Sequence, residues 1–252
     1  MIRHARRSRA IALVTLAVVT LAPALDAQAT PTAEQVIERH VAAIGGRAAW
    51  QRKQSMRLVT DVSLGRAGTA VEELLVDRAG HVFTHSMYGL HDVRGGFDGE
   101  TAWEVDATNG ASILTGKRKE SLRMMANLPL VAYEKGSVLS ATLVGAADFD
   151  GRKAWQLTVV PLVGREMTEY FDQETGFKIG ARMTFADEAR EWDVRYSYRD
   201  YTRYGDVMYP KTTAQYTAMA GEQVATTTTL EFDTVPASAF ALPDAVRTLR
   251  KP

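Results

Sequence analysis

Apolar residues along this chain first follow a helical spacing and then the alternating spacing of strands. The helical spacing connects Val36, Ile37, Val41 and Ile44. Thr32 and Gln35 precede these residues as a capping box, and Gly45-Gly46 follows them as a stop. The pattern predicts an N-terminal helix, then a second helical turn over residues 47–54 with Trp50 pointing inward.

The alternating segments are short and are divided by turn-forming residues, which is typical of an antiparallel sheet. In the clearest of them, Trp192, Val194, Tyr196 and Tyr198 alternate with Asp193, Arg195, Ser197 and Arg199. The close spacing of the segments indicates a barrel or a strongly curved sheet. We predict about eleven strands, at residues 56–64, 70–77, 81–88, around 103, 138–144, 153–160, 166–171, 177–185, 192–199, 208–217 and 223–232.

Residues 93–116 are rich in turn-forming pairs. Asp98-Gly99 and Asn109-Gly110 supply the positive-φ residues that tight hairpins need. Gly95-Gly96 is interpreted as a further turn, so that a short strand around Trp103 lies between turns. The stretch therefore predicts a twisted antiparallel meander.

One convincing helical pattern interrupts the strands, over residues 117–127. Leu122, Met125 and Ala126 recur at helical spacing, and Leu128-Pro129 follows. Met124-Met125 adds two flexible thioether side chains, which adapt to irregular apolar partners. The segment suits a mobile lid over a lipid cavity and a plain core helix equally well.

The first 29 residues have the three parts of a secretory signal peptide. Several arginines precede an apolar run over residues 10–21, and Ala27-Gln28-Ala29 is a small-x-small cleavage site. The run is shorter than the roughly 20 residues that span a bilayer, which disfavours a membrane anchor. We predict cleavage after Ala29, a single domain over residues 30–252 and a soluble exported protein.

Charge and cysteine content narrow the function classes. The 252 residues carry 30 basic and 30 acidic side chains, and residues 1–29 hold four of the arginines and one aspartate. The remainder has a formal charge of −3, which argues against a nucleic-acid partner. With no cysteine, the chain can form no disulfide, thiolate metal site, cysteine nucleophile or cysteine-linked lipid anchor.

Catalytic and metal-binding patterns are sparse. No nucleophile elbow, phosphate loop or His-Glu-x-x-His motif is present, and no acid–base pair stands out for a hydrolase. His81 and His85 would lie more than about 10 Å apart on a strand, too far to share one ion without a bulge. His40, on the helical stripe, is interpreted as a packed or partly exposed histidine. We therefore predict no enzyme, no metal and no cofactor.

Large apolar side chains are abundant for this number of strands. A curved sheet has a concave face that must be filled or covered, and core packing accounts for most of these side chains. The alternative interpretation is that some of these side chains line an apolar ligand cavity with a lid. The candidate lining residues are Phe83, Phe97, Trp103, Leu122, Met124, Met125, Leu128, Phe171 and Trp192.

Five motifs, in this order, resemble the LolA/LolB-like superfamily of periplasmic lipoprotein-sorting proteins. They are AIGGRAAW (43–50), GGFDGETAWE (95–104), YFDQETGFKI (170–179), DYTRYGDVMYPK (200–211) and FALP (240–243). The resemblance implies a mainly β (α+β) fold, an incomplete antiparallel barrel whose open side helices cover. It also implies an apolar cavity for acyl chains, without a metal or organic cofactor. The lid arginine of the carriers has no assignable counterpart here.

The resemblance further implies a soluble periplasmic carrier that moves lipid or lipoprotein acyl chains towards the outer membrane. Its partners would be a lipid or acylated protein and membrane-associated donor and acceptor proteins, with no nucleic acid. The alternative is a periplasmic interaction or envelope-stress sensor module that uses the same fold without lipid transport.

Overall fold

The computed structural model describes residues 30–126, 128, 133–134, 138–162, 164–186 and 189–250. The predicted signal peptide, residues 1–29, lies outside them and stays a prediction. Residues 31–252 form one compact unit, to which the following description applies. Its helices are α1 (Ala33–Ala43), α2 (Arg47–Gln51), α3 (Gly116–Met124) and α4 (Asp244–Arg247), with 3-10 turns η1 (Gly65–Ala67) and η3 (Ala237–Phe240).

The strands form one antiparallel sheet, so the predicted mainly β fold is confirmed. The described residues contain thirteen strands rather than about eleven, because residues 91–114 form three strands where one was predicted. The strands are β1 (Ser55–Ser63), β2 (Thr69–Asp77), β3 (Val82–Tyr88), β4 (His91–Phe97), β5 (Ala102–Asp106), β6 (Gly110–Leu114), β7 (Val138–Phe149), β8 (Arg152–Pro161), β9 (Met167–Asp172), β10 (Lys178–Ala186), β11 (Glu191–Tyr204), β12 (Val207–Thr217) and β13 (Gly221–Phe232).

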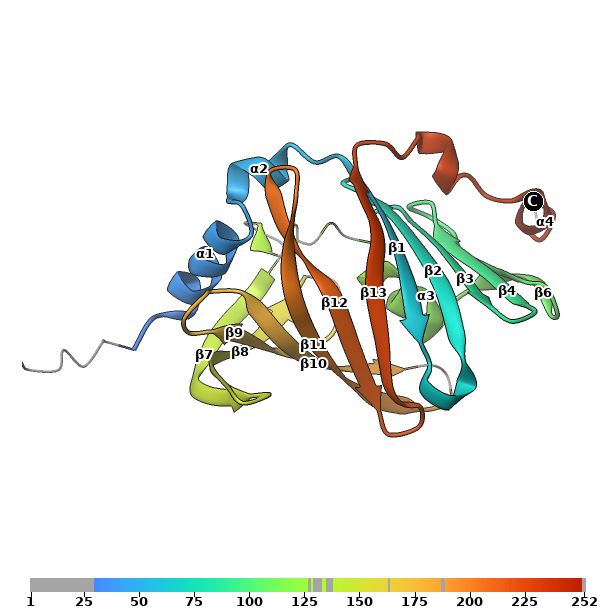
Figure 1. Cartoon of the computed structure of the whole chain (residues 1–252). Helices are drawn as coiled ribbons and strands as arrows, with labels where there is room; N and C mark the ends of the chain where they lie inside the picture. The colour runs from blue at the N-terminus through green and yellow to red at the C-terminus, as the bar shows by residue number, and fades with distance from the viewer. Residues whose placement is uncertain are drawn as a thin grey trace, which may run out of the picture. The chain divides into compact units, whose positions relative to one another are not determined.

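Two meanders make up the sheet (Figure 1). Strands β1 to β6 run outward to one edge, β7 begins at the opposite edge, and β13 returns to pair with β1. The edge strands β6 and β7 are not paired with each other, so the sheet is open. Helix α3 contacts β4 and β5 near one edge and also β10 in the other meander. The sheet must therefore curve around α3. This open, curved sheet is the incomplete barrel that was predicted.

Helices α1 and α3 pack on the inner, concave face of this sheet. One buried cluster joins Val36, Val41 and Trp50 of the N-terminal helices to Leu157 and Val159 of β8. A second cluster places Leu122, Ala126 and Leu128 against Met56, Val76, Val82 and Ala102. The predicted capping box of α1 is confirmed, since the Gln35 amide donates to Thr32 Oγ1 at 3.2 Å and the Thr32 amide donates to Gln35 Oε1 at 2.8 Å.

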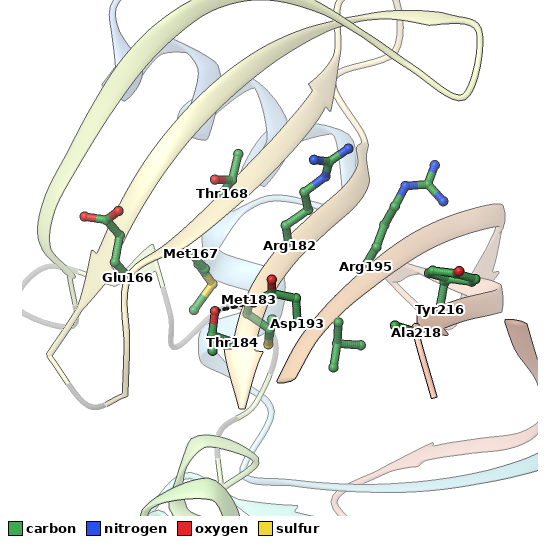
Figure 2. Close-up of a pocket in the computed structure, with 11 residues that line it drawn as sticks. Glu166, Met167, Thr168, Arg182, Met183, Thr184, Asp193, Arg195, Tyr216 and Ala218 are labelled. Carbon is green, nitrogen blue, oxygen red and sulfur yellow. Dashed lines mark hydrogen bonds between the residues drawn. The ribbon is translucent and has the colours of Figure 1, made fainter. Parts of the chain in front are cut away.

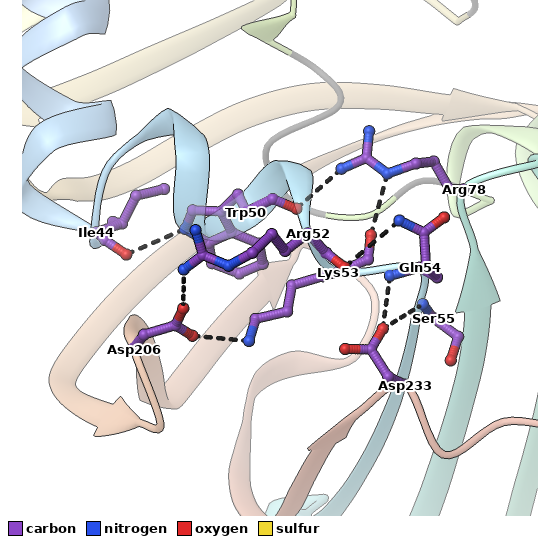
Figure 3. Close-up of polar contacts among 9 residues, drawn as sticks. All are labelled: Ile44, Trp50, Arg52, Lys53, Gln54, Ser55, Arg78, Asp206 and Asp233. Atoms are coloured by element: carbon purple, nitrogen blue, oxygen red, sulfur yellow. Dashed lines mark hydrogen bonds and ion pairs between the residues drawn. The ribbon is translucent and has the colours of Figure 1, made fainter.

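The corner between α2 and β1 is fixed by hydrogen bonds to backbone groups and by ion pairs (Figure 3). Trp50 Nε1 donates to the Ile44 carbonyl at 3.0 Å, and Arg78 donates to the Trp50 carbonyl at 2.9 Å. Asp206 pairs with Arg52 at 2.6 Å and Lys53 at 2.7 Å, and these bonds lower the pKa of its carboxyl to about 2. Trp50 is 1% exposed, as its predicted inward position requires.

Gly95-Gly96 was predicted as a turn, and this prediction is wrong. Both glycines lie inside β4, paired with Thr84 and Phe83 on β3, while the turns at Asp98-Gly99 and Asn109-Gly110 connect the strands as predicted. Glycine is needed at position 96 because of close packing: a Cβ there would lie 2.6 Å from the Trp103 ring. The indole thus lies flat against the strand.

Phe83 and Trp103 lie on the outer face of the sheet. Val82 and Ala102, their chain neighbours, pack with α3 on the inner face, and successive strand residues point to opposite faces. The two outer rings are 6.2 Å apart, and the C-terminal Phe240 lies near His81 on the same side. Trp103 Nε1 is buried without a hydrogen-bond acceptor among the described residues.

No helix in the described part of the chain is long and apolar enough to cross a membrane.

Replacing Gly96 with alanine tests the close packing of the indole. The added methyl group should collide with the Trp103 ring and lower the free energy of unfolding by about 1–3 kcal/mol, the usual cost of overpacking. Urea denaturation measures this change. In a Trp103→Leu background the same substitution should cost much less, and an equal cost in both backgrounds would contradict the explanation.

Candidate functional site

A groove with two connected lobes lies between α3 and the inner face of the sheet. Each lobe has a volume of about 380 Å³, within the range of small-molecule sites. We call them the tyrosine lobe and the polar lobe, after the side chains that distinguish them. The residues that line both lobes, and so form the waist between them, are Leu74, Met125, Tyr196, Tyr198 and Tyr209.

The tyrosine lobe has an apolar roof and an aromatic floor. Met124 and Met125 come from the end of α3, and the remaining lining residues are His40, Ile44, Trp50, Leu74, Tyr133, Lys178, Tyr196, Tyr198, Tyr201, Met208, Tyr209 and Pro210. The alternation of β11 places Tyr196 and Tyr198 on the same face, where their rings stack at 6.2 Å. Tyr201 also lines the lobe, because the alternation breaks at the positive-φ residue Asp200.

The tyrosine lobe therefore contains phenols that stay neutral at physiological pH. Burial raises the pKa of Tyr196, Tyr198 and Tyr201, and it raises the pKa of Tyr209 to about 12. Tyr201 donates its hydroxyl to the Lys178 carbonyl at 2.8 Å. No bond from the hydroxyls of Tyr196, Tyr198 or Tyr209 to another described residue is present, so these groups can bond to a ligand.

One partly buried cation, Lys178, lines the tyrosine lobe, and it is already paired. Lys178 Nζ donates to Glu169 Oε1 and to the Tyr133 hydroxyl, each at 3.0 Å, and Tyr133 donates to the Glu169 carboxylate. Burial is the largest single influence and lowers the lysine pKa, but Glu169, Tyr133 and Tyr198 together outweigh it and hold the pKa of Lys178 well above its usual value. The pair is thus a neutralised structural unit, which costs less to bury than a lone ammonium.

His40 is packed, in agreement with its interpretation from the sequence. It is 3% exposed, and its ring contacts Tyr133 and Phe171 edge-on at 5.6 and 5.3 Å between centroids. Its Nδ1 lies 3.2 Å from both the Lys178 amide nitrogen and the Gly176 carbonyl oxygen. Burial and then the charge of Lys178 lower its pKa to about 3, so the ring is neutral at physiological pH.

The polar lobe lies over the middle of the sheet. Glu72 on β2 is in register with Thr60 on β1 and with Ser86 on β3, so these three side chains form a polar row across the inner face. Other inner-face polar groups complete the lining, namely Thr84, Thr213, Gln215 and Thr227. Glu72 is exposed, but the surrounding wall of the groove partly desolvates its carboxyl and raises the pKa.

The nine candidate cavity residues divide into several environments. Met124 and Met125 line the tyrosine lobe, and Leu122 and Leu128 anchor α3 and the following residues in the core. Phe97 belongs to the same core cluster, and Phe171 belongs to the cluster under α1. Phe83 and Trp103 lie on the outer face, and Trp192 stacks on Phe185 at 6.2 Å. Ligand binding at these nine residues stays a prediction.

Sequence reasoning missed most of the groove wall. The tyrosines of β11 and β12, Lys178 and Glu72 were not candidates, although the alternation of Tyr196 and Tyr198 was a usable signal. Among the described residues, no group of three or more His, Asp or Glu side chains is arranged to hold a metal ion.

A further pocket of about 440 Å³ lies on the outer face, over β9 to β12 (Figure 2). Arg182 and Arg195 project from adjacent strands, directly opposite each other. Arg195 is paired with Asp150, and Asp193 accepts a hydrogen bond from Thr184 at 2.7 Å. Thr184, Asp193 and Arg195 thus have polar partners within the fold, and we regard the inner groove as the stronger candidate site.

The low pKa of His40 predicts a loss of stability in mild acid. Below about pH 6.5 the unfolded chain takes up a proton at this histidine and the folded chain does not, down to about pH 3. Stability should therefore fall by about 1.4 kcal/mol per pH unit over this range. Urea denaturation from pH 7 to pH 5, compared with His40→Asn, isolates this histidine. Parallel pH dependence in the two proteins would contradict the assignment.

The chain matches no protein-family model, and a search of curated proteins finds no similar sequence. Solved structures do resemble it. A LolA superfamily protein from Nitrosomonas europaea has 11% identity and a TM-score of 0.57, covering 84% of this chain and 98% of that protein. A putative outer membrane lipoprotein-sorting protein domain from Vibrio parahaemolyticus has 12% identity and a TM-score of 0.51. The likeness covers 82% of this chain and 97% of that one.

A third similar structure is a DUF1329 family protein from Desulfovibrio piger, with 11% identity, a TM-score of 0.52 and coverage of 83% and 97%. Identities this low establish the fold and leave function open. The likeness extends over most of each chain and agrees with the open antiparallel sheet around α3. The protein has the LolA-like fold, as the order of its sequence motifs predicted.

Proposed function

We propose that the groove binds the acyl chain of a lipid or lipoprotein, and that the protein carries this cargo through the periplasm towards the outer membrane. The observation that carries the proposal is the tyrosine lobe, an apolar and aromatic cavity roofed by two methionines at the end of a short helix. The LolA-like fold and the predicted signal peptide support the same direction.

The energetics of the tyrosine lobe suit a chain of methylene groups. Each buried methylene contributes about 0.8 kcal/mol, so ten of them would contribute about 8 kcal/mol before the cost of association. Methionine side chains can repack around chains of different length and shape. The charge of Lys178 is compensated by Glu169, so an apolar chain next to it would not strip an unpaired ammonium of its solvent.

Helix α3 is suited to act as a cover that opens. It has nine residues, of which Leu122 is the buried one, and Met125 beyond its end is 43% exposed. Opening would break hydrogen bonds of α3 with the sheet, from Arg118 to Glu104 at 2.9 Å, from Lys119 to the Glu100 carbonyl at 2.7 Å and from Ser121 to the Ala186 carbonyl at 3.2 Å. The first two are exposed to solvent, where such contacts contribute little to stability. Cargo would then pass to whichever acceptor binds it more favourably, without a nucleotide at this protein.

The proposal predicts a bound lipid in the natural protein. Native mass spectrometry of protein purified from a periplasmic extract without detergent should show adducts of lipid mass that disappear after organic extraction. A bare mass, together with failure to take up added phospholipid or lipopeptide, would favour the alternative of an interaction or envelope-stress sensor module.

Met125→Asp should weaken acyl-chain binding at least tenfold, because it places a charge in the apolar waist of the groove. The melting temperature should change little, since this side chain is 43% exposed. Met87→Asp is the matched control, because Met87 is 42% exposed and lines neither lobe. Titration with a fluorescent fatty acid measures the affinities, and equal affinities for the two variants would remove α3 from the binding site.

A further inference from the structure

The polar lobe is lined by acidic side chains, and no lysine or arginine is among its described lining residues. The charged or chargeable side chains there are two glutamates, Glu72 and Glu73, and one histidine, His85. Glu73 accepts a hydrogen bond from Arg57 Nε at 2.7 Å, and His85 Nε2 lies 3.0 Å from Asp92 Oδ1. Glu72 is the remaining carboxylate, and it forms no ion pair with another described residue.

The position of Glu72 follows from the alternation of β2. Ala70, Leu74 and Val76 share its face, and Val76 packs in the inner core, so the Glu72 side chain lies on the concave side. Its neighbours in register are the hydroxyl-bearing Thr60 and Ser86. The Glu72 side chain is exposed on this side of the sheet, so a ligand in the polar lobe can reach its carboxylate.

The waist tyrosines connect Glu72 to the tyrosine lobe. After burial, the charges of Tyr198 and Glu72 both raise the pKa of Tyr196, so the Glu72 carboxylate and the Tyr196 phenol influence each other across the groove. The groove therefore changes along its length from methionine and aromatic carbon to hydroxyl groups and a carboxylate without a cation.

We infer that the polar lobe binds the ammonium group of an amphiphile whose alkyl chain lies in the tyrosine lobe, with Glu72 as its counter-ion. This inference rests on the acyl-chain binding proposed above and adds the chemistry of the head group. An ammonium would donate to the Glu72 carboxylate and to the hydroxyl oxygens of Thr60 and Ser86. Charge-assisted hydrogen bonds of this kind are stronger than neutral ones. An anionic head group would instead face an uncompensated carboxylate.

Three amphiphiles with the same chain separate the head group from the chain. Dodecylamine, dodecanol and dodecanoate are titrated into the protein at pH 7 below their micelle concentrations, with isothermal titration calorimetry as the readout. The wild-type protein should bind dodecylammonium about tenfold more tightly than dodecanol, as one charge-assisted hydrogen bond provides, and dodecanoate more weakly than either.

Glu72→Gln should abolish the tenfold preference for the amine over dodecanol. The matched control is Asp61→Asn, which changes the net charge equally on the neighbouring strand, at an exposed position of the opposite face. Glu72→Thr, which copies the hydroxyl-bearing neighbours, is a second variant should the carboxamide disturb folding. Melting temperatures verify that each variant is folded.

The outcomes separate the two proposals. Loss of the amine preference in Glu72→Gln but not in Asp61→Asn supports the inference. Equal binding of all three amphiphiles, or equal effects of the two substitutions, overturns it while acyl-chain binding stands. Failure of wild-type protein to bind dodecanol overturns acyl-chain binding itself.

The same variants identify the source of the ammonium group. Lysophosphatidylethanolamine represents an amine lipid, and an N-dodecanoyl dipeptide with a free lysine side chain represents an acylated basic protein segment. The source is the probe whose affinity falls in Glu72→Gln and not in Asp61→Asn. If neither affinity falls, the assignment of Glu72 as counter-ion is overturned.

Discussion

The connection between the two meanders has to cross the full width of the sheet, because β6 and β7 form its opposite edges. Helix α3 belongs to this connection and packs on the concave face, where it contacts strands of both meanders. The order of the strands therefore supplies the cover of the groove. The helix has one buried residue of its own, and the buried residues Leu114 before it and Ala126 and Leu128 after it help to hold it in place.

The inner surface under this cover is divided chemically. At one end, Lys178, Glu169 and Tyr133 satisfy one another, so that a buried ion pair coexists with an apolar cavity. At the other end, Glu72 has hydroxyl-bearing neighbours and no cation among the described residues. Neutral tyrosines separate the two regions. The arrangement distinguishes an amphiphilic ligand from a purely apolar one, and gives the groove a direction along its length.

Periodicity predicted the helical start, the alternating strands and the helix at α3, because each depends on local spacing of apolar residues. It failed at Gly95-Gly96, where glycine serves the approach of a ring from another strand and no local pattern reveals this. It also could not identify the faces of β3 and β5, so Phe83 and Trp103 were assigned to the cavity although they lie outside it. Glu72 and Lys178 also lie beside groove residues that are distant in sequence, Tyr196 for Glu72 and Tyr133 for Lys178.

The pairing of β1 with β13 has a consequence for how the protein folds. Arg57 and Glu231, which meet across these strands, are 174 residues apart in the chain. A chain that emerges from its amino end can form β1 to β6 early, but the first meander keeps an unpaired edge at β1 until the last strand arrives. Long-range pairing of this kind is slow, and an exposed strand edge invites association with other chains. Copies of the chain would thus be most vulnerable to aggregation before their final strand has formed.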